Sequence, residues 1–244
     1  MNKTELLGEI RAILENTPII YKYINSEDAL KIISNKSIML SNPKKFNDPF
    51  DCYDGLIKYS KIPKSKLGEL KEKYGNVYPK AIERINLALE LNQTNDLTNV
   101  FKNFGLPNVL SKIGVTCFSK NPNQLLMWSH YANSHSGVCI GFDLIKLYES
   151  LENISPSKKA LLKIDYKKTF EAKDYFLDDG TILHWLKTKS HHWAYEEEIR
   201  IIYHNLNLDQ DLNRLIKFSS KAIAEITFGA AFSFKDNSFV IIDR

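Results

Sequence analysis

The spacing of hydrophobic residues predicts a helix followed by a strand at the start of the chain. Apolar residues recur at helical spacing between Leu6 and Leu14. We expect this helix to end at Asn16, because Pro18 pushes the residue before it out of helical geometry. Residues 19–24, IIYKYI, are β-branched or aromatic at most positions, and this composition favours a strand.

A short helix, a second strand and a turn-rich stretch are expected next. Asn25 can cap a helix that carries Leu30 and Ile33 on its apolar face. Residues 37–40, SIML, form a short apolar run that predicts a strand, and the polar sequence SNPKKFNDPFD at 41–51 is rich in turn formers. From about residue 61 to about residue 112, charged residues and asparagines alternate with leucines at helical spacing, without strand signals. This pattern predicts a helical insertion in a single domain over residues 1–244.

The second half of the chain predicts an alternation of strands and helices. GVTCFS at 114–119 is expected to be a strand, and Asn121 can cap a helix that Pro122 opens. Gly137 can adopt the positive φ that ends this helix before the strand VCIGFD at 138–143.

The remaining elements complete an α+β fold. We expect strands at KALLKID (159–165), IRIIYH (199–204) and AEITFG (224–229), and a helix at TILHWLKTKS (181–190). Helices and strands are mixed without a regular βαβ alternation, which favours a compact mixed β-sheet core over a doubly wound sheet.

Composition limits the classes of protein. The chain has 244 residues, of which 43% are hydrophobic and 25% charged, as in soluble globular proteins. Its net charge of +4 permits an anionic ligand without implying one. No stretch approaches the roughly 18 apolar residues of a membrane span, and the N-terminus lacks the apolar core of a signal peptide. Three widely separated cysteines lack zinc or redox spacing. We therefore expect a cytoplasmic protein with reduced thiols and no membrane partner.

The acidic run in WAYEEEIR (193–200) is the first candidate for chemistry. The β-branched residues that follow it favour a strand, which would place Glu196, Glu198 and Arg200 on one face and Glu197 on the other. One interpretation is an ion pair between Arg200 and a glutamate. The other is a pair of carboxylates that binds sugar hydroxyls and stabilises positive charge in a transition state. Spacing alone does not choose between them.

FNDPFD (46–51) is the second candidate. Asn47 and Asp48 are turn formers, and Pro49 holds Asp48 in extended geometry. The segment is either a rigid turn at a strand end or one wall of a cleft, with Asp48 or Asp51 reaching a ligand. We expect FNDPFD and Ser119 to border the same cleft, because turn formers and polar side chains gather at these strand ends.

LMWSHYANSHSGVCIGF (126–142) is the third candidate. Trp128 and Tyr131 share a helical face, which is typical of core packing and less often of ligand stacking. Ser129, His130 and His135 remain as polar candidates. No spacing matches a zinc motif, so no metal site is predicted.

Six segments in this order resemble the bacterial family called domain of unknown function 2971. They are IYKY (20–23), FNDPFD (46–51), CFS (117–119), LMWSHYA (126–132), GVCIGFD (137–143) and WAYEEEIR (193–200). The family name supplies no activity.

The order of elements also resembles the ADP-ribosyltransferase superfamily. Its members begin with a strand bearing a polar or aromatic residue, continue through a strand ending in serine or tyrosine, and present a late Glu, often as Glu-x-Glu. Ser119 and the pair Glu196 and Glu198 take the last two places, whereas the first strand has Tyr21, Lys22 or Tyr23 where many members have His or Arg.

This resemblance implies a split sheet and NAD as a substrate. Glu198 would stabilise the charge on ribose and Glu196 would position the acceptor. The residues implied to bind NAD are Tyr21, Lys22, Tyr23, Asn47, Asp48, Ser119, His130, Tyr131 and Arg200.

Three functions therefore stay open. The first is an enzyme that transfers ADP-ribose from NAD to a protein or nucleic acid, as a toxin or anti-phage effector with an antitoxin or defence-system partner. The second is a non-catalytic module that binds a nucleotide or nucleic acid through Lys22, Lys44, Lys45 and Arg200. The third is a metal-assisted hydrolase that uses Asp48, Asp51, His130 and Glu198.

Overall fold

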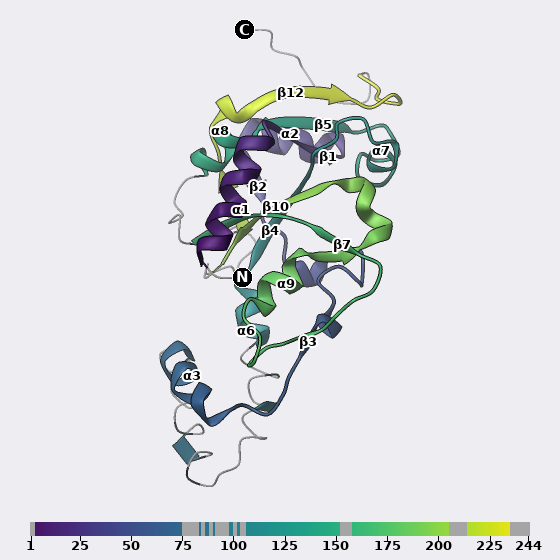
Figure 1. Ribbon diagram of the computed structural model, residues 1–244. Coiled ribbons are helices and arrows are strands. Elements are labelled where there is room, and N and C mark those ends of the chain that lie inside the picture. The colour runs from purple at the N-terminus through teal and green to yellow at the C-terminus, as the bar shows by residue number, and fades with distance from the viewer. Residues whose placement is uncertain are drawn as a thin grey trace.

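The computed structural model is built around a six-stranded sheet with the order β12-β5-β1-β4-β10-β6 (Figure 1). It describes residues 3–74, 106–151, 158–204 and 214–234, together with isolated positions between 75 and 105. Every pairing within this sheet is antiparallel. Its strands are β1 (Ile19–Ile24), β4 (Gly114–Ser119), β5 (Val138–Asp143), β6 (Lys159–Lys163), β10 (Glu198–Tyr203) and β12 (Ile223–Phe228).

Helices and three small sheets surround this core. The α-helices are α1 (Lys3–Asn16), α2 (Ser26–Asn35), α3 (Leu67–Tyr74), α6 (Leu106–Ser111), α7 (Leu125–Tyr131), α8 (Leu144–Ser150) and α9 (Thr181–Lys187). The 3₁₀ helices are η1 (Pro43–Lys45), η2 (Asp54–Leu56), η3 (Lys64–Lys66), η6 (His191–Glu196) and η8 (Ser220–Ala222). The two-stranded sheets pair β2 (Ser37–Met39) with β11 (Leu215–Lys217), β3 (Ile57–Lys58) with β8 (Lys173–Asp174), and β7 (Asp165–Lys167) with β9 (Thr188–Ser190). The α+β class is confirmed.

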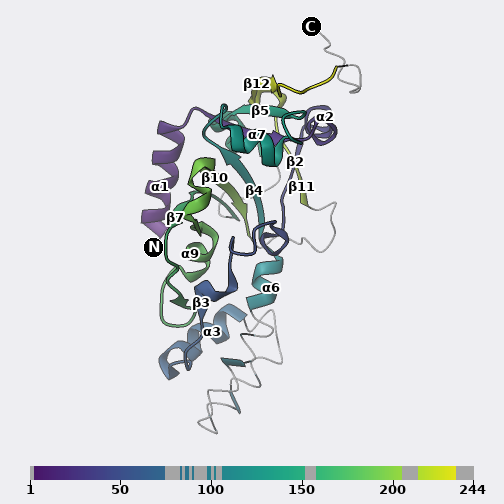
Figure 2. The same cartoon turned by 90° about the vertical axis from the view of Figure 1, so that its right-hand side faces the viewer.

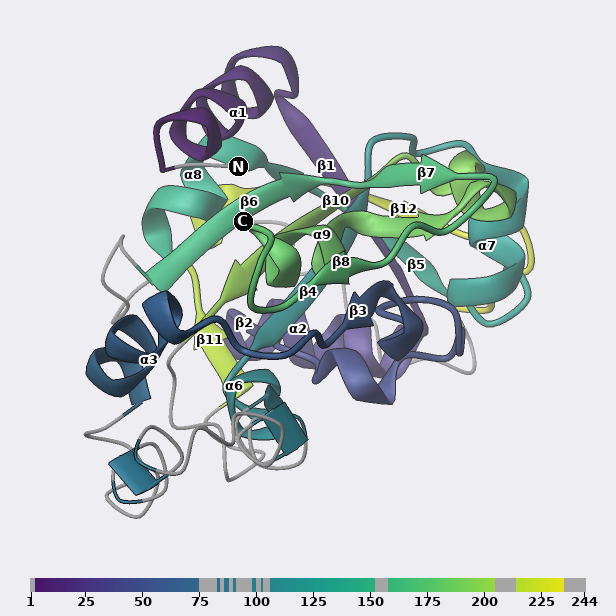
Figure 3. The same ribbon diagram turned by 60° about the horizontal axis from the view of Figure 1, so that its bottom comes forward.

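Both faces of the main sheet are covered, and β4, β5 and β10 are buried at nearly every position. Ile201 of β10 joins one core, which α2 and α8 cover, while Ile202 packs on the other face against Trp185 of α9. Figure 2 shows α2 and α9 on opposite sides, and Figure 3 shows α9 lying across β4 and β10. Strand side chains alternate between faces. A polar residue with an even residue number in β10 therefore points toward the side of the sheet that α9 covers.

The sheet divides in its middle. β1 pairs with β4 at one position, Tyr21 opposite Ser119. Its other neighbour, β5, pairs with β1 at all six positions, and β10 likewise pairs with all of β4. Three strands therefore lie on each side of a narrow junction. The other residues of β1 and β4 do not pair with each other.

Strand predictions for residues 19–24, 114–119 and 138–143 are confirmed with the same boundaries. The predicted helix cap at Asn121 is wrong, because the Asn121 side chain accepts from the backbone N–H of Asn123 in a local turn. Helix α7 begins at Leu125 instead, and the side chain of Gln124 caps it.

The predicted helix at 181–190 is too long. It ends at Lys187, and residues 188–190 form β9, which pairs in parallel with β7. Thr188 has extended backbone geometry, in keeping with the preference of β-branched residues for strands. The predicted strand at 159–165 is interrupted at Ile164, whose N–H donates to the carbonyl of Glu198.

Within the predicted insertion at 61–112, the described residues include η3, α3 and α6. Helix α3 lies away from the main sheet in Figures 1 and 3. Most of the segment between 75 and 105 lies outside the described residues, and the single-domain organisation stays a prediction.

Candidate functional site

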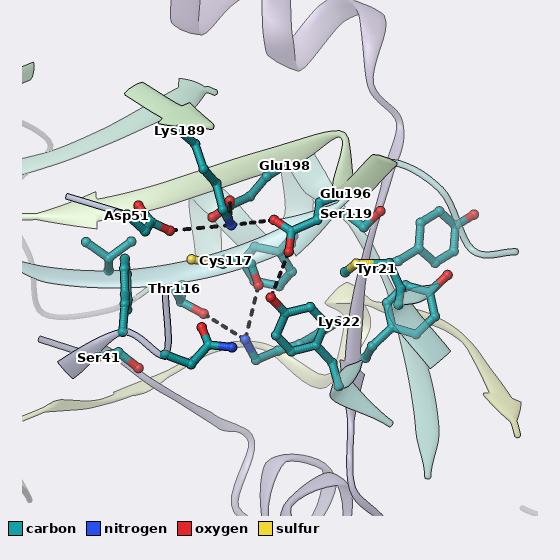
Figure 4. Close-up of a pocket in the computed structure, with 17 residues that line it drawn as sticks. Tyr21, Lys22, Ser41, Asp51, Thr116, Cys117, Ser119, Lys189, Glu196 and Glu198 are labelled. Carbon is teal, nitrogen blue, oxygen red and sulfur yellow. Dashed lines mark hydrogen bonds and ion pairs between the residues drawn. The ribbon is translucent and has the colours of Figure 1, made fainter. Parts of the chain in front are cut away.

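A cavity of about 190 Å³ opens where β1 and β4 separate (Figure 4). Its walls come from β1, β4, β10, α7, β9, η6 and the loop after η1. Nine of the residues singled out in the sequence line it: Tyr21, Lys22, Tyr23, Asn47, Asp51, Ser119, Tyr131, Glu196 and Glu198. FNDPFD and the end of β4 thus border the same cavity, as expected.

One row of residues crosses five neighbouring strands at this cavity. Ser119 of β4 lies opposite both Tyr21 of β1 and Glu198 of β10. On its other side, Tyr21 lies opposite Gly141 of β5, which in turn lies opposite Glu225 of β12. Directly paired residues point to the same face of a sheet. The row therefore presents a phenol, a hydroxyl and a carboxylate side by side.

Gly141 leaves the space that this row requires. A Cβ atom there would lie 2.6 Å from Cγ of Glu225 and 3.2 Å from Cε1 of Tyr21. The Glu225 side chain crosses over this glycine and hydrogen-bonds to the Tyr21 side chain. Burial raises the pKa of Tyr21, and the hydrogen bond and charge of Glu225 raise it further.

Glu196 does not lie on the strand, which corrects the sequence prediction. It ends the 3₁₀ helix η6, Glu197 adopts left-handed geometry with φ of 45°, and β10 begins at Glu198. The N–H of Glu197 donates to the carbonyl of Ala194, which closes the turn, and the Glu197 side chain is exposed. Glu198 and Arg200 do share a strand face, as predicted.

Both glutamates nevertheless reach the same cation, Lys189 of β9. The Lys189 ammonium lies 2.5 Å from Oε2 of Glu196 and 3.0 Å from Oε2 of Glu198. It also lies 3.4 Å from Oδ2 of Asp51, in the loop after η1. Figure 4 shows these three carboxylates converging on Lys189 from different elements.

Arg200 supports the carboxylates from behind. Its Nε lies 2.7 Å from Oε1 of Glu198, and one terminal nitrogen lies 2.6 Å from Oδ2 of Asp51. The other terminal nitrogen donates to the carbonyl of Leu186 at 2.9 Å. The Arg200 side chain has no exposed surface. The ion pair that the sequence left as one interpretation is therefore present, inside a cluster of three carboxylates and two cations.

The two glutamates titrate differently. Burial alone would raise the pKa of Glu198, but Arg200 and Lys189 outweigh it and hold that pKa well below its usual range. Burial raises the pKa of Glu196 despite the opposing charge of Lys189. Tyr131 of α7 donates its hydroxyl to Oε1 of Glu196 at 2.7 Å. The site therefore holds one strongly acidic carboxylate and one whose proton affinity is increased.

Lys22 occupies the gap between β1 and β4. Its ammonium donates to the carbonyl of Cys117 at 3.1 Å and to Oγ1 of Thr116 at 3.3 Å, and it lies 5.2 Å from the centre of the Phe118 ring. Burial lowers the pKa of Lys22, while Cys117 and Glu198 oppose that shift. A lysine side chain thus replaces part of the missing strand pairing.

Ser119 and Tyr23 have structural partners at the cavity wall. Oγ of Ser119 accepts from the N–H of Asn121 at 3.0 Å and donates to the Asn121 carbonyl at 3.2 Å. The Tyr23 hydroxyl donates to the same carbonyl at 2.7 Å. These bonds hold the turn between β4 and α7, and they fix both side chains beside the cavity.

Three of the residues implied to bind NAD do not line the cavity: Asp48, His130 and Arg200. Asp48 accepts from the N–H of Phe50 within its turn. His130 is exposed and lies against the rings of Trp193 and Tyr195. Arg200 lies behind Glu198, because its side chain is directed away from the cavity toward α9.

The sequence does not predict Lys189 as a site residue, and it indicates Asp51 only as an alternative to Asp48 in a cleft wall and as a residue of the metal-assisted hydrolase. Lys189 stands in a polar stretch, KTKS, that resembles the solvated end of a helix. Two features place it in the site: residues 188–190 form β9, and η6 turns back so that Glu196 approaches it. Neither feature has a local sequence signal.

Among the described residues, no group of three or more His, Cys, Asp or Glu side chains could hold a metal ion. In this part of the chain there is also no helix with the length and apolar character needed to cross a membrane.

Comparison with known proteins finds one family model that matches part of the chain. Residues 127–201 match the family model described as "Protein of unknown function (DUF2971)". The matched segment runs from α7 through β10 and includes Tyr131, Lys189, Glu196 and Glu198. The family resemblance expected from the sequence is confirmed over this segment. No curated protein and no solved structure matches the chain.

Proposed function

We propose that this DUF2971 chain is an ADP-ribosyltransferase-like enzyme that cleaves NAD and modifies a macromolecule. The observation that carries the proposal is the row of Tyr21, Ser119 and Glu198 on three adjacent strands, directed at one cavity. An aromatic residue, a hydroxyl and a late glutamate are the three features that the superfamily resemblance requires. The single pairing between β1 and β4 also supports a split sheet of the kind that the resemblance implies.

The chemistry is a nucleophilic substitution at ribose. The bond between C1′ of ribose and the ring nitrogen of nicotinamide breaks, and its electron pair leaves with nicotinamide, which becomes neutral. The ribose ring then carries positive charge, until a nucleophile of the acceptor bonds to C1′ and loses its proton. Glu198, held ionised by Arg200 and Lys189, would stabilise the ribose charge, and Glu196 would accept the proton of the nucleophile.

The charge of the cluster suits this substrate. Asp51, Glu196 and Glu198 carry three negative charges against the two positive charges of Lys189 and Arg200. Lys22 adds a third cation at the cavity wall, so the preference for positive charge comes from the position of Glu198, whose carboxylate lines the cavity. A carboxylate there favours a positively charged nicotinamide ring and, more strongly, a positively charged ribose.

The size of the cavity favours insertion of one half of the dinucleotide. A volume of about 190 Å³ is below the roughly 300–1,000 Å³ of pockets that enclose a drug-sized ligand. The nicotinamide and its ribose would enter, and the adenosine half would remain nearer the surface. The acceptor would be a protein or nucleic acid, consistent with a toxin or phage-defence effector that has an antitoxin or defence-system partner.

Nicotinamide release tests the proposal directly. The protein is incubated with NAD and a cellular extract, and both released nicotinamide and mass added to protein, RNA or DNA are measured. Glu198→Gln keeps size and hydrogen bonding but removes the charge. We expect turnover to fall on the order of 10² to 10³, as for loss of one preorganised electrostatic group.

Glu197→Gln is the matched control, because Glu197 is adjacent in sequence but exposed. Its turnover should equal that of the wild-type protein. Equal behaviour of the two variants, or no nicotinamide release by the wild-type protein with any extract, would reject the enzyme. The non-catalytic nucleotide-binding module is the alternative, but Arg200 has no exposed surface to meet a phosphate and Lys44 pairs with Asp54.

A further inference from the structure

We infer that Lys189 is a positioning residue that holds Glu196 and Glu198 side by side, both charged, on the wall of the cavity. The catalytic consequence rests on the proposed function, whereas the electrostatic role of Lys189 stands on its own. No local pattern in the sequence distinguishes this lysine from the many on the surface.

Lys189 contacts two glutamates that belong to different elements, η6 and β10. Glu196 ends a 3₁₀ helix, Glu198 begins a strand, and the left-handed residue Glu197 separates them. Among the described residues, Lys189 is the one cation in ion-pair distance of Glu196. Glu198 has Arg200 as a second partner. Loss of the lysine would therefore leave Glu196 without a cation and Glu198 with one.

Burial makes this partnership decisive. The side chains of Lys189, Glu196 and Glu198 are only 6%, 3% and 4% exposed. Two buried carboxylates that share a site disfavour each other's ionisation unless a cation lies between them. An uncompensated buried charge is strongly unfavourable, so a carboxylate that loses its cation takes up a proton instead. Glu196 is the group that would respond, because burial already raises its pKa.

The backbone fixes Lys189 at this point. In the parallel pair of β7 and β9, Lys189 lies opposite Tyr166. The Tyr166 hydroxyl accepts from the N–H of Glu198 at 2.8 Å, so the same ladder fixes the lysine and the start of β10. The Lys189 ammonium also lies 5.2 Å from the centre of the Trp193 ring, which covers it on a further side. The ammonium is held by the fold and does not depend on ligand for its place.

Several titratable groups face the Lys189–Glu196 pair. They are Asp51 in the loop after η1, Tyr131 on α7, Tyr166 on β7, Tyr195 on η6, and Glu198 and Arg200 on β10. The tyrosines are neutral near pH 7, because an unperturbed tyrosine has a pKa of about 10 and burial raises the pKa of each of these further. Lys189 is thus the positive group whose removal changes the ionisation of Glu196 most directly.

The test compares Lys189→Met and Lys189→Arg with Lys187→Met. Lys187 is two residues away and is also largely buried, but its partners do not line the cavity. It pairs with Glu9 at 2.7 Å and with Asp165 at 3.7 Å. We measure kcat/KM for nicotinamide release between about pH 5 and about pH 9. In Lys189→Met the acid limb should move to higher pH, so that the ratio of rates at about pH 9 and about pH 6 rises about tenfold over wild type.

Lys189→Arg retains the charge and should restore most of the wild-type profile, whereas Lys187→Met should leave the profile unchanged. If the role of Lys189 were purely structural, Lys189→Met would lower the amount of folded protein without moving the acid limb. An acid limb in Lys189→Met that coincides with that of wild type overturns the inference.

A second measurement does not need activity or a folded Lys189→Met protein. Carbon-13 NMR of glutamate carboxyl carbons, with Glu196→Gln and Glu198→Gln to assign the signals, follows both groups in the wild-type protein. We expect both carboxylates to be ionised at about pH 7. A protonated Glu196 in the wild-type protein at that pH overturns the role of Lys189. Absence of nicotinamide release together with two ionised glutamates rejects the proposed function alone.

Discussion

Ser119 of β4 and Glu198 of β10 lie directly opposite each other, so that a buried hydroxyl and a buried carboxylate face the same cavity. This pairing explains why Glu198 is confined. The strand fixes its backbone, Cys117 hydrogen-bonds to its side chain, and Arg200 holds its carboxylate in two contacts. A carboxylate held in this way has little freedom to reorganise when charge develops nearby, which is the condition for electrostatic stabilisation.

Glu198 should make the protein sensitive to acid. Its pKa is lowered in the folded state by Arg200 and Lys189, relative to about 4.3 in an unfolded chain. The stability that it contributes is therefore present above about pH 4.3 and is lost as the pH falls through the folded pKa. We expect the free energy of unfolding of Glu198→Gln, measured by urea denaturation, to fall less steeply with acidification than that of wild type. An equal slope in the two proteins would contradict this assignment, and Glu197→Gln supplies the unchanged control.

Arg200 should be required for folding stability. It is fully buried between Glu198 and Asp51, and its removal leaves both carboxylates without that cation. Breaking a buried ion pair by removing one partner typically costs about 3–5 kcal/mol, and we expect this loss in the free energy of unfolding of Arg200→Met. Urea denaturation followed by circular dichroism measures it.

An exposed ion pair provides the comparison. Lys31 pairs with Glu27 and Asp28 on the surface of α2, and surface pairs contribute little to stability. Lys31→Met should therefore unfold at the same urea concentration as wild type. If the free energies of unfolding of Arg200→Met and Lys31→Met agree within error, the buried cluster reorganises at little cost and Arg200 is not required for stability.

Much of the strand framework could be predicted from sequence because its signals are local. IIYKYI, GVTCFS and VCIGFD are rich in β-branched, aromatic and other apolar residues and are bounded by turn formers, and the structure begins and ends each strand where the sequence suggested. The asparagine and proline at 121–122 predict a helix that begins several residues before its true start at Leu125. The sequence does not reveal that the Asn121 side chain closes a local turn and does not cap the helix.

The site could be predicted only in part. Ser119 and Glu198 are found because each stands at the end of a recognisable strand. The sequence predicts Glu196 on the strand, whereas the strand begins only after Glu197. Glu197 adopts the left-handed backbone conformation, which is uncommon for any residue other than glycine and therefore has no signal in the sequence. Lys189 could not be found at all, because its three carboxylate partners come from separate segments that only the tertiary fold unites.

Gly141→Ala should uncouple Tyr21 from Glu225 without unfolding the protein. The new Cβ would lie 2.6 Å from Cγ of Glu225, closer than such contacts allow, so one side chain must move. Glu225 is exposed and flexible on the edge strand β12, whereas Tyr21 is partly packed beside α7. We therefore expect Glu225 to swing away and its hydrogen bond to Tyr21 to be lost, with a change in the free energy of unfolding of about 1 kcal/mol or less.

The pKa of Tyr21 reports this change. Burial raises that pKa, and the hydrogen bond and charge of Glu225 add to the shift, so loss of Glu225 from the ring should lower it. Absorbance titration of the tyrosines, with Tyr21→Phe to assign the signal, measures the direction, and Glu225→Gln should lower the pKa as well by removing the charge. If Tyr21 titrates at the same pH in Gly141→Ala, Glu225→Gln and wild type, Glu225 does not hold the Tyr21 ring. The cavity edge at β1 would then depend on Tyr21 packing alone.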